Sequence, residues 1–237
     1  MQIALLGYGK MGKVIEELAT AKGHHIALTI DNEQEWEEKK SRFANVDVAI
    51  DFSTPETVID NINRCFELKI PIVIGTTGWY KQIEELKYRC EKDNHTLLWA
   101  SNFSIGVNIF FKINESLAQL MNHYDDYQVN LEEIHHTGKL DAPSGTAISL
   151  ANDIIAKLDR KKNWQLGQTD DVHSLSVIAK RIDPVPGTHT IKYESDIDSI
   201  EIIHTAKSRK GFAIGALTAA EWILEKKGFY EFKEVFF

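Results

Sequence analysis

Cysteine is scarce in this sequence. Only Cys65 and Cys90 occur among 237 residues, both in stretches with helical periodicity, and neither belongs to a C-x-x-C or another metal-ligand spacing. A disulfide scaffold is therefore excluded, and we expect two reduced thiols, as is usual inside cells. With 43% hydrophobic and 26% charged residues, the composition also excludes a disordered or collagen-like chain. It is typical of a globular protein with one large or two modest domains.

The sequence also has no excess of positive charge and no long hydrophobic run. Its 35 acidic residues outnumber its 27 basic residues, which gives a net charge of -8. This balance argues against a nucleic-acid or anionic-membrane partner, because both need basic residues that neutralise phosphates. No stretch approaches the roughly 18 apolar residues of a membrane helix. The N-terminal MQIALLGYGKMG lacks the basic segment of a signal peptide. We therefore expect a cytoplasmic protein.

The first hundred residues alternate between apolar runs and amphipathic stretches. The apolar runs predict strands buried on both faces of a parallel sheet, at residues 2–7, 24–31, 46–53, 71–78 and 95–103. The amphipathic stretches predict helices at 11–22, 55–69 and 79–92, and the acidic segment 32–45 predicts only a loop or a short helix. Strand–helix alternation with short connections implies right-handed crossovers. We therefore predict an α/β Rossmann domain with a doubly wound sheet.

After Phe103 the pattern changes to an α+β organisation. Helices are predicted at 105–123 and 147–157, and strands at 127–135, 174–182, 188–195 and 199–207. The last three strands follow one another through short turns, which indicates antiparallel hairpins in a mixed, mostly antiparallel open sheet. A final helix, 211–226, would return to the first domain. The sequence thus predicts a dinucleotide-binding domain of residues 1–103 and 209–237, and a substrate-binding and oligomerisation domain of residues 104–208.

The second sheet has few helices to cover it. If both lie on one face, the other face is bare, and exposed surfaces of that size usually mark an interface. We therefore expect the second domain to drive self-association. The alternative is a monomer in which the helix at 104–123 covers the second face.

A glycine motif opens the chain. Gly7-Tyr8-Gly9-Lys10-Met11-Gly12 matches G-x-G-x-x-G directly after the first predicted strand and at the start of a helix. In this context Gly7 permits the turn, Gly9 lets backbone N–H groups approach a pyrophosphate, and Gly12 allows close packing of helix and strand. The motif predicts dinucleotide binding, although glycines also serve simple tight turns.

Asp31 ends the second predicted strand, where an acidic residue accepts hydrogen bonds from the adenosine ribose. A carboxylate there repels a 2′-phosphate, and the following Asn32 carries no positive charge, although Lys10 could partly compensate. The residues therefore favour NADH, or use of both NADH and NADPH, over strict use of NADPH.

Small and hydroxylated residues follow the next three strands. They are Ser53 after the third strand, Gly75, Thr76 and Thr77 after the fourth, and Ala100, Ser101, Asn102 and Phe103 at the end of the fifth. The carboxyl ends of strands form the ligand crevice of open α/β sheets. These residues therefore suit a nicotinamide and its ribose, with ordinary loop chemistry as the alternative.

The densest cluster of chemistry-bearing residues lies at 133–146. It brings His135, His136 and Lys139 together and then runs into a helix N-terminus at Ser144-Gly145-Thr146. Free N–H groups and the helix dipole at such a terminus favour a carboxylate, and the imidazoles and lysine can supply protons. The stretch therefore predicts a site for an anionic small molecule with a proton donor. A capped helix with solvated charges is the alternative.

A metal site is not expected in this cluster. Adjacent histidines on a strand point to opposite faces, so His135 and His136 cannot share one ion, and no third ligand is apparent.

Several motifs together resemble a known family. The string His135-His136-x-x-Lys139-x-Asp141-Ala142-Pro143-Ser144-Gly145-Thr146-Ala147 resembles the hallmark of the 4-hydroxy-tetrahydrodipicolinate reductase (dihydrodipicolinate reductase) family of bacterial lysine biosynthesis. The glycine motif, Asp51-Phe52-Ser53, Gly75–Gly78 and Ala100–Asn108 are similar to the family's other motifs, in the same order.

The resemblance implies NAD(P)H-dependent reduction of the cyclic dicarboxylate 4-hydroxy-tetrahydrodipicolinate to tetrahydrodipicolinate, with loss of water, in a homotetramer. It makes His135 a proton donor or acceptor and Lys139 the second proton donor. The residues implied to hold the substrate are His136, Ser144, Gly145 and Thr146. Arg209 and Phe212 would add cofactor contacts to those of the glycine motif and the strand ends. The alternatives are another Rossmann dehydrogenase, acting on a small amino or hydroxy acid, and a non-catalytic NAD(H)-binding module.

Overall fold

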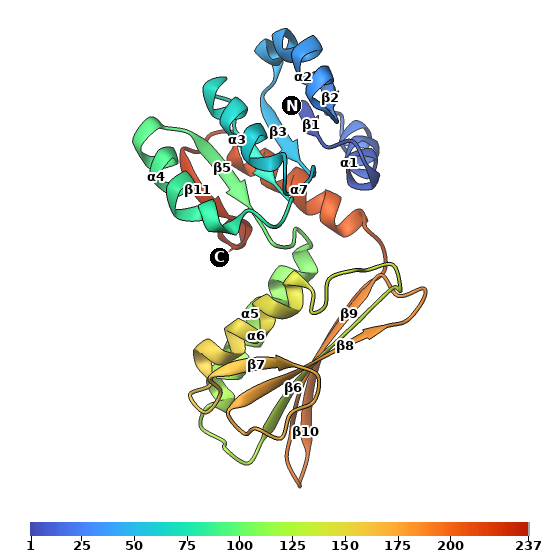
Figure 1. Ribbon diagram of the computed structural model, residues 1–237, viewed down its shortest axis with the longest axis vertical. Coiled ribbons are helices and arrows are strands. Elements are labelled where there is room, and N and C mark those ends of the chain that lie inside the picture. Colours follow the sequence, from blue (N-terminus) through green and yellow to red (C-terminus); the bar gives the residue numbers. More distant parts are fainter. Residues whose placement is uncertain (237) are drawn as a thin grey trace. The chain divides into compact units, whose positions relative to one another are not determined.

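Two compact units make up the chain. The computed structural model describes residues 1–236. Unit 1 comprises residues 1–104 and the residues from 209 onward, and unit 2 comprises residues 105–208 (Figure 1). Each unit has its own sheet and its own hydrophobic core, so the two are described separately.

Unit 1 is built on a six-stranded sheet in which every strand pair is parallel. Its strands are β1 (Gln2–Leu6), β2 (His25–Ile30), β3 (Val48–Asp51), β4 (Ile72–Ile74), β5 (Thr96–Trp99) and β11 (Gly228–Glu231). Their order is β11-β5-β4-β3-β1-β2, so the direction of winding changes between β1 and β3. The predicted doubly wound sheet is confirmed, whereas β11 was not predicted because its four half-buried residues follow no periodic pattern.

Helices cover both faces of this sheet (Figure 1). They are α1 (Lys10–Ala21), α2 (Glu33–Lys39), α3 (Val58–Glu67), α4 (Ile83–Asp93) and α7 (Lys210–Ile223), with 3₁₀ turns at Lys40–Asn45, Tyr80–Gln82 and Phe232–Val235. One apolar cluster packs α2, α3 and α4 on the sheet, and a second packs α1 and α7 on the other face. Cys65 of α3 and Cys90 of α4 are buried free thiols.

Two helix boundaries in unit 1 have local causes. The segment 32–45, for which a loop or a short helix is expected, contains the short helix α2, because the Asn32 side chain caps it by accepting a hydrogen bond from the Glu35 N–H at 3.0 Å. The helix expected from residue 55 begins only at Val58, because the Thr57 N–H donates to the Thr54 carbonyl and closes a turn first.

Unit 2 is built on a five-stranded mixed sheet with the order β10-β9-β6-β8-β7. Its strands are β6 (Gln128–His135), β7 (Asn163–Leu166), β8 (Ser174–Arg181), β9 (Gly187–Glu194) and β10 (Ser199–Ala206). The central strand β6 is antiparallel to β9 and parallel to β8, and β7 is parallel to β8. The mixed sheet is thus confirmed, with two antiparallel and two parallel strand pairs. The hairpin expected between β8 and β9 is wrong, because β6 lies between them, whereas β9 and β10 do form one.

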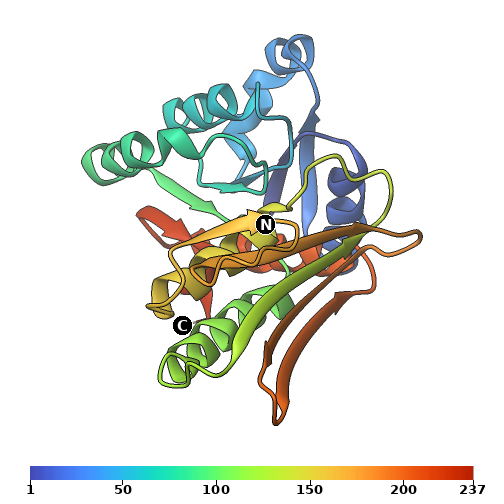
Figure 2. The same ribbon diagram turned by 60° about the horizontal axis from the view of Figure 1, so that its bottom comes forward.

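Both helices of unit 2, α5 (Ile105–Met121) and α6 (Gly145–Lys157), pack on the same face of its sheet (Figure 2). Strand β6 alternates accordingly, with Val129 and Leu131 buried beneath the helices and Asn130 and Glu132 on the opposite face. The alternative in which the helix at 104–123 covers the second face is therefore wrong. No helix in residues 1–236 is long and apolar enough to span a membrane.

Candidate active site

The glycine motif forms the turn between β1 and α1. Gly7 has a φ of +86°, and a Cβ atom placed on it would lie 2.4 Å from the Phe52 carbonyl oxygen. A Cβ atom on Gly12 would lie 2.6 Å from the Gly7 carbonyl oxygen, so both positions require glycine. A Cβ atom on Gly9 would meet no described atom within 4 Å, which leaves the backbone there open to approach.

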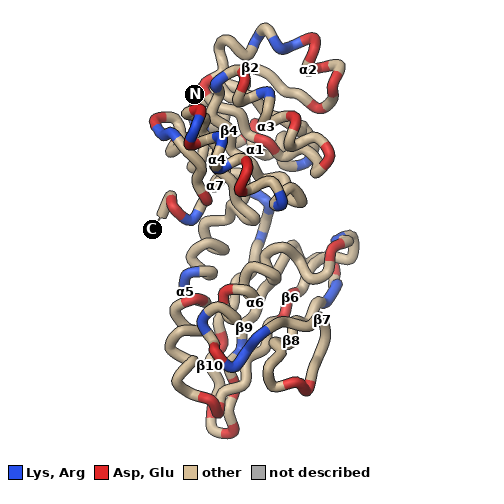
Figure 3. The backbone as a smooth tube through the Cα atoms, turned by 60° about the vertical axis from the view of Figure 1, so that its left-hand side comes forward, with Lys and Arg blue, Asp and Glu red and all other residues tan. Residues whose placement is uncertain are grey.

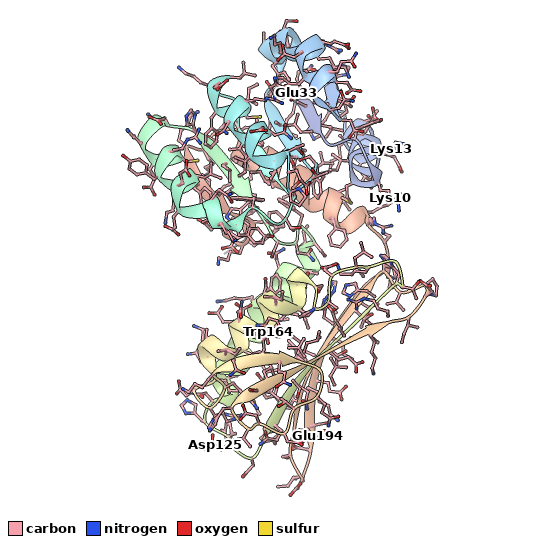
Figure 4. All side chains as sticks on the ribbon, viewed as in Figure 1. Lys10, Lys13, Glu33, Asp125, Trp164 and Glu194 are labelled. Atoms are coloured by element: carbon pink, nitrogen blue, oxygen red, sulfur yellow. The ribbon has the colours of Figure 1, made fainter. Side chains whose placement is uncertain are left out.

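The start of α1 has the character of an anion site. Gly9 is the N-cap residue and has no side chain with which to cap the first N–H groups, and the first turn contains no acidic residue. Lys10 and Lys13 extend from this helix (Figure 4), whereas Tyr8 and Met11 pack against the apolar cluster beneath α1. Free N–H groups and the helix dipole therefore remain for a phosphate.

Asp31 follows β2 and contacts the glycine turn. Its Oδ1 accepts a hydrogen bond from the Tyr8 N–H at 2.9 Å, and its own N–H donates to Glu35 Oε2 at 3.1 Å. Glu35 is paired with Lys39 at 3.0 Å, and its hydrogen bond with this lysine lowers the pKa of its carboxyl. Figure 3 shows further acidic residues along α2. A second carboxylate thus stands beside Asp31.

A buried carboxylate ties together the loops that follow β3 and β4. Asp51 is fully buried and accepts hydrogen bonds from Thr76 Oγ1 at 2.6 Å, Ser53 Oγ at 2.8 Å and Asn61 Nδ2 at 2.8 Å. Burial raises the pKa of Asp51, although these hydrogen bonds oppose the shift. A Cβ atom on Gly75 would lie 2.3 Å from the Phe52 ring, so Gly75 cannot carry a side chain without displacing that ring.

The segment that follows β5 carries further candidate cofactor residues of unit 1. Phe103 packs its ring 6.0 Å from that of Phe52, and Asn102 Oδ1 accepts a hydrogen bond from the Ser104 N–H at 2.8 Å. The structure thus brings the predicted residues of the first, third, fourth and fifth strand ends together at one edge of the sheet. Thr77 follows Thr76 in the loop after β4, and Ala100 and Ser101 follow β5. Arg209 is the exposed N-cap residue of α7, and Phe212 lies half-buried in its first turn.

In unit 2, strand alternation explains the burial of the histidine cluster. The face of β6 that buries Val129 and Leu131 continues through Glu133 to His135, and both of these side chains are buried. His136, one residue later, is half-buried. In the sheet, Glu133 pairs with His189 of β9 and His135 pairs with Arg181 of β8.

Glu133 is the centre of this cluster. Its Oε1 lies 3.2 Å from Arg181 Nη2, and its Oε2 accepts a hydrogen bond from the Ser144 N–H at 3.0 Å. The same Oε2 lies 3.6 Å from His135 Nδ1 and 3.8 Å from His189 Nε2. Since Glu133 is fully buried, its charge is balanced by the guanidinium and not by solvent.

The two buried imidazoles have lowered pKa values. Burial lowers the pKa of His135, the Glu133 charge opposes this shift, and the positive charge of Lys139 reinforces it. Burial, together with the neighbouring His135, lowers the pKa of His189 to about 3. The His189 ring contacts the His135 ring edge to face, with 5.2 Å between centroids. His189 is therefore neutral near pH 7.

The loop after β6 carries Lys139 and is fixed at several points. Lys139 Nζ lies 2.7 Å from Asp141 Oδ1, and although burial opposes the shift, the hydrogen bond with Lys139 lowers the pKa of Asp141. Arg181 donates to the Lys139 carbonyl oxygen at 3.3 Å and to the Asp141 carbonyl oxygen at 2.5 Å. The Thr137 N–H donates to Asp183 Oδ1 at 3.1 Å. Side chains at the C-terminal end of β8 and just after it therefore fix the path of this loop.

The loop ends at the N-terminus of α6. Ser144 is buried and caps the helix by accepting a hydrogen bond from the Ala147 N–H at 3.1 Å. Thr146 is also buried, whereas Gly145 is exposed and a Cβ atom on it would meet no described atom within 4 Å. The helix start therefore offers N–H groups a few residues after Lys139 in the chain, which suits a carboxylate ligand.

The expectation that the cluster lacks a third residue of metal-ligand type is wrong. Among residues 1–236, Glu133, His135 and His189 place one such atom each within 4.8 Å of one another. Arg181 and the Ser144 N–H already hold the Glu133 carboxylate, however, and a guanidinium at this distance opposes a second cation. The arrangement fits proton transfer and anion binding better than metal binding.

Sequence reasoning gave no role to Glu133, Arg181 and His189. The alternation of β6 was a usable signal, since an acidic residue two positions before His135 must share its buried face. Arg181 and His189 come from strands whose pairing with β6 depends on long-range topology, which a local pattern does not contain.

Comparison with known proteins gives consistent matches over the chain. The family model "Dihydrodipicolinate reductase, N-terminus" matches residues 1–103, and "Dihydrodipicolinate reductase, C-terminus" matches residues 106–236. The 4-hydroxy-tetrahydrodipicolinate reductase of Christiangramia forsetii is 48% identical over 235 residues, covering 99% of this chain and 97% of that protein. The enzyme of the same name from Thermosipho africanus is 36% identical over 241 residues, with coverage of 99% and 97%.

Solved structures share the fold. A dipicolinate-bound dihydrodipicolinate reductase from Paenisporosarcina sp. TG-14 superimposes with a TM-score of 0.76 at 22% identity, covering 99% of this chain and 98% of that one. A probable dehydrogenase from Thermotoga maritima superimposes with a TM-score of 0.56 at 10% identity, covering 94% and 87%. At these identities the likeness concerns the fold alone.

Proposed function

Because this chain belongs to the dihydrodipicolinate reductase family, we propose that it reduces 4-hydroxy-tetrahydrodipicolinate to tetrahydrodipicolinate with loss of water, in lysine biosynthesis through diaminopimelate. The observation that carries this proposal is the junction of β6 and α6, where the buried Glu133 carboxylate contacts His135 and the Ser144 N–H at the helix start, and the connecting loop carries Lys139. Such a junction supplies both proton donors and N–H groups for a dicarboxylate.

The cofactor in this proposal is a reduced nicotinamide dinucleotide, which supplies the hydride when bound. Residues Gly7 to Gly12 fit its pyrophosphate, because glycine is sterically required at both ends of the turn and the first turn of α1 is uncapped. The loops with Ser53, Gly75–Thr77 and Ala100–Phe103 would hold the nicotinamide half, and Arg209 and Phe212 would add contacts from α7.

Asp31 determines the expected cofactor preference. Its carboxylate would accept hydrogen bonds from the hydroxyls of the adenosine ribose, and the charge of the neighbouring Glu35 is balanced by Lys39. A 2′-phosphate would be repelled by Asp31, and Asn32 offers no compensating charge. NADH, or dual use of NADH and NADPH, follows from this arrangement.

The substrate carboxylates would be held by opposite charge and by N–H donors. Lys139 supplies the positive charge, the uncrowded backbone at Gly145 supplies an N–H group at a helix N-terminus, and Thr146 follows it in the first turn. His136 and Ser144 complete this set. Each of these residues lies within the short segment from the end of β6 to the start of α6. A single loop would therefore bind the dicarboxylate.

The reaction takes up one hydride and one proton and releases one water. Loss of the hydroxyl group as water gives a conjugated imine. Hydride addition to this imine leaves an enamine, whose carbon must then be protonated by a positioned acid. His135 is held beside Glu133 as proton donor or acceptor, and Lys139 is the second proton donor. A positioned donor of this kind contributes about 10²–10⁴-fold in rate.

We also propose that the protein assembles as a homotetramer through the uncovered face of the unit 2 sheet. This face carries exposed Ile203 and half-buried Ile134 and Ile178 among polar side chains. It is hollowed by a cavity of about 330 Å³ lined by Asn130, Glu132, Gln168, Ile178, Thr190, Lys192 and Glu201. Burying such a face against a second copy removes apolar surface from water.

A coupled assay tests the proposed reaction. The purified protein is mixed with freshly formed 4-hydroxy-tetrahydrodipicolinate and either NADH or NADPH. The decrease in absorbance of the reduced nicotinamide is then followed over time. Turnover is expected, with kcat/KM for NADH at least equal to that for NADPH. Turnover only with small amino or hydroxy acids would identify another dehydrogenase, and nicotinamide binding without any turnover would identify a binding module. A large advantage for NADPH would contradict the role of Asp31.

A further inference from the structure

A buried ion pair stands behind the proposed proton donors. Glu133 is fully buried, and its two carboxylate oxygens divide their contacts between different parts of unit 2. Oε1 faces Arg181 at 3.2 Å, and Oε2 accepts from the Ser144 N–H at 3.0 Å while lying 3.6 Å from His135 Nδ1. Among residues 1–236, His135 Nδ1 has no hydrogen-bond partner within normal distance, and its ion-pair contact is with Glu133.

Each of these contacts leads to a residue with a proposed role. Ser144 caps α6, so its position sets that of the Gly145 and Thr146 N–H groups. Arg181 reaches past Glu133 to the carbonyl oxygens of Lys139 and Asp141, which fixes the loop that carries the Lys139 amine. One carboxylate therefore connects the imidazole, the lysine loop and the helix start.

We propose that Glu133 is a positioning residue of the reductase site, which holds His135, the Lys139 loop through Arg181, and the start of α6 in one arrangement. This inference rests on the function proposed above and assigns Glu133 no contact with substrate or cofactor. Displacing reacting groups by about 1 Å lowers enzymatic rates by about a hundredfold, so a residue that fixes three such groups controls turnover without binding anything itself.

Glu133 also sets the charge around His135. The charged and titratable groups that face the imidazole are Glu133 from β6, Arg181 from β8, His189 from β9, and Lys139 and Asp141 from the loop. The carboxylates of Glu133 and Asp141 raise the pKa of His135, whereas burial, Lys139 and Arg181 lower it. Loss of the Glu133 charge therefore lowers this pKa further. If protonated His135 is the donor, activity is lost as pH rises through its pKa, and this limb moves to lower pH in the variant.

The substitution Glu133→Gln separates shape from charge. An amide has one acceptor oxygen and one donor nitrogen, whereas Glu133 accepts from the Ser144 N–H on one oxygen and from Arg181 on the other. Whichever way the amide is oriented, its NH₂ group faces a donor. Glu133→Asp keeps the charge but is one methylene shorter, so it tests position with the charge retained.

The test combines turnover with a direct titration of His135 by NMR of its ring protons. For Glu133→Gln we expect a kcat lower by about tenfold to a hundredfold, an unchanged Kd for NADH, and a shift of both the alkaline activity limb and the His135 titration to lower pH. For Glu133→Asp we expect a lower kcat with a titration midpoint closer to that of the wild type. The matched control is Glu115→Gln, which removes the same charge from exposed ion pairs with Lys112 and Lys157 on the helical layer.

The outcomes discriminate between this inference and the proposed reaction. The NMR titration needs no turnover, so an unshifted His135 in Glu133→Gln overturns the role of Glu133 whether or not the wild type is a reductase. A wild-type kcat in Glu133→Gln overturns it equally. If Glu133→Gln does not fold, Arg181→Lys keeps the charge but loses the planar donor fork, and an unchanged kcat in that variant contradicts the inference.

Discussion

Asp51 and Glu133 are carboxylates that end up buried because each continues the buried face of its strand. Asp51 closes β3, whose four residues are all buried, and Glu133 follows Val129 and Leu131 on the inner face of β6. An unpaired charge in such a place is costly, so each carboxylate collects donors, namely Thr76, Ser53 and Asn61 for Asp51 and an ion pair for Glu133. At the residue scale, these satisfied buried acids fix the loops on which the proposed functions depend.

His189 gives a prediction about stability and pH. Burial lowers its pKa to about 3, while the unfolded chain titrates near the ordinary value of 6.5. Between these values the unfolded state binds the extra proton, so stability falls as pH drops, by at most about 1.4 kcal/mol per pH unit for this group. In His189→Gln we expect the free energy of unfolding to depend less steeply on pH below 6.5, as measured by urea denaturation at pH 7, 5.5 and 4.5.

The control for this measurement is His123→Gln, which removes an exposed imidazole from the same unit. It should retain the wild-type slope. A slope in His189→Gln that equals that of the wild type would show that His189 is not held neutral by the fold.

At the element scale, the sequence predicted well where periodicity was long and poorly where pairing was non-local. The parallel strands of unit 1 were predictable because runs such as Ile3–Leu6 are apolar throughout, as strands buried on both faces must be. β7 and β11 were missed because, unlike β3, β4 and β5, their residues are exposed or half-buried and form no apolar run. The β8–β9 hairpin was expected from a short connection, yet β6 inserts between these strands, and nothing in residues 174–195 encodes that insertion.

The candidate site follows the same rule. His135, Lys139 and Ser144 were predictable because they lie in one continuous segment in which a strand leads into a capped helix. Arg181 and His189 were not, because they reach the segment only through the register of β8 and β9 against β6. Candidate residues within one segment can thus be predicted from the sequence. The residues that position them cannot, because their placement depends on the pairing of distant strands.

At the scale of the whole molecule, the proposed assembly depends on the uncovered sheet face of unit 2. Both α5 and α6 pack on the opposite face, which leaves β6, β8, β9 and β10 with a mixed polar and apolar surface. Edge strand β10 lies at one border of this surface and presents Ile203, which is 58% exposed. Pairing with a second copy would cover both the face and the edge.

Ile203→Lys tests this assembly. A lysine at this position would place a charge within the proposed interface, so we expect a smaller molecular mass than that of the wild type in size-exclusion chromatography with light scattering. Leu120→Lys, at an exposed position of α5, is the control and should keep the wild-type mass. A wild type that is monomeric at micromolar concentration, or an Ile203→Lys variant with unchanged mass, would contradict assembly through this face.

The central claim is that the loop between β6 and α6 supplies the proton for a nicotinamide-dependent reduction, and Lys139→Ala tests it most directly. We expect kcat with 4-hydroxy-tetrahydrodipicolinate to fall by about 10²–10⁴-fold, with the Kd for NADH unchanged because the dinucleotide motif lies in unit 1. Lys162→Ala, which removes an exposed lysine of unit 2, should leave both constants at wild-type values. Turnover by Lys139→Ala within twofold of the wild type would contradict the account.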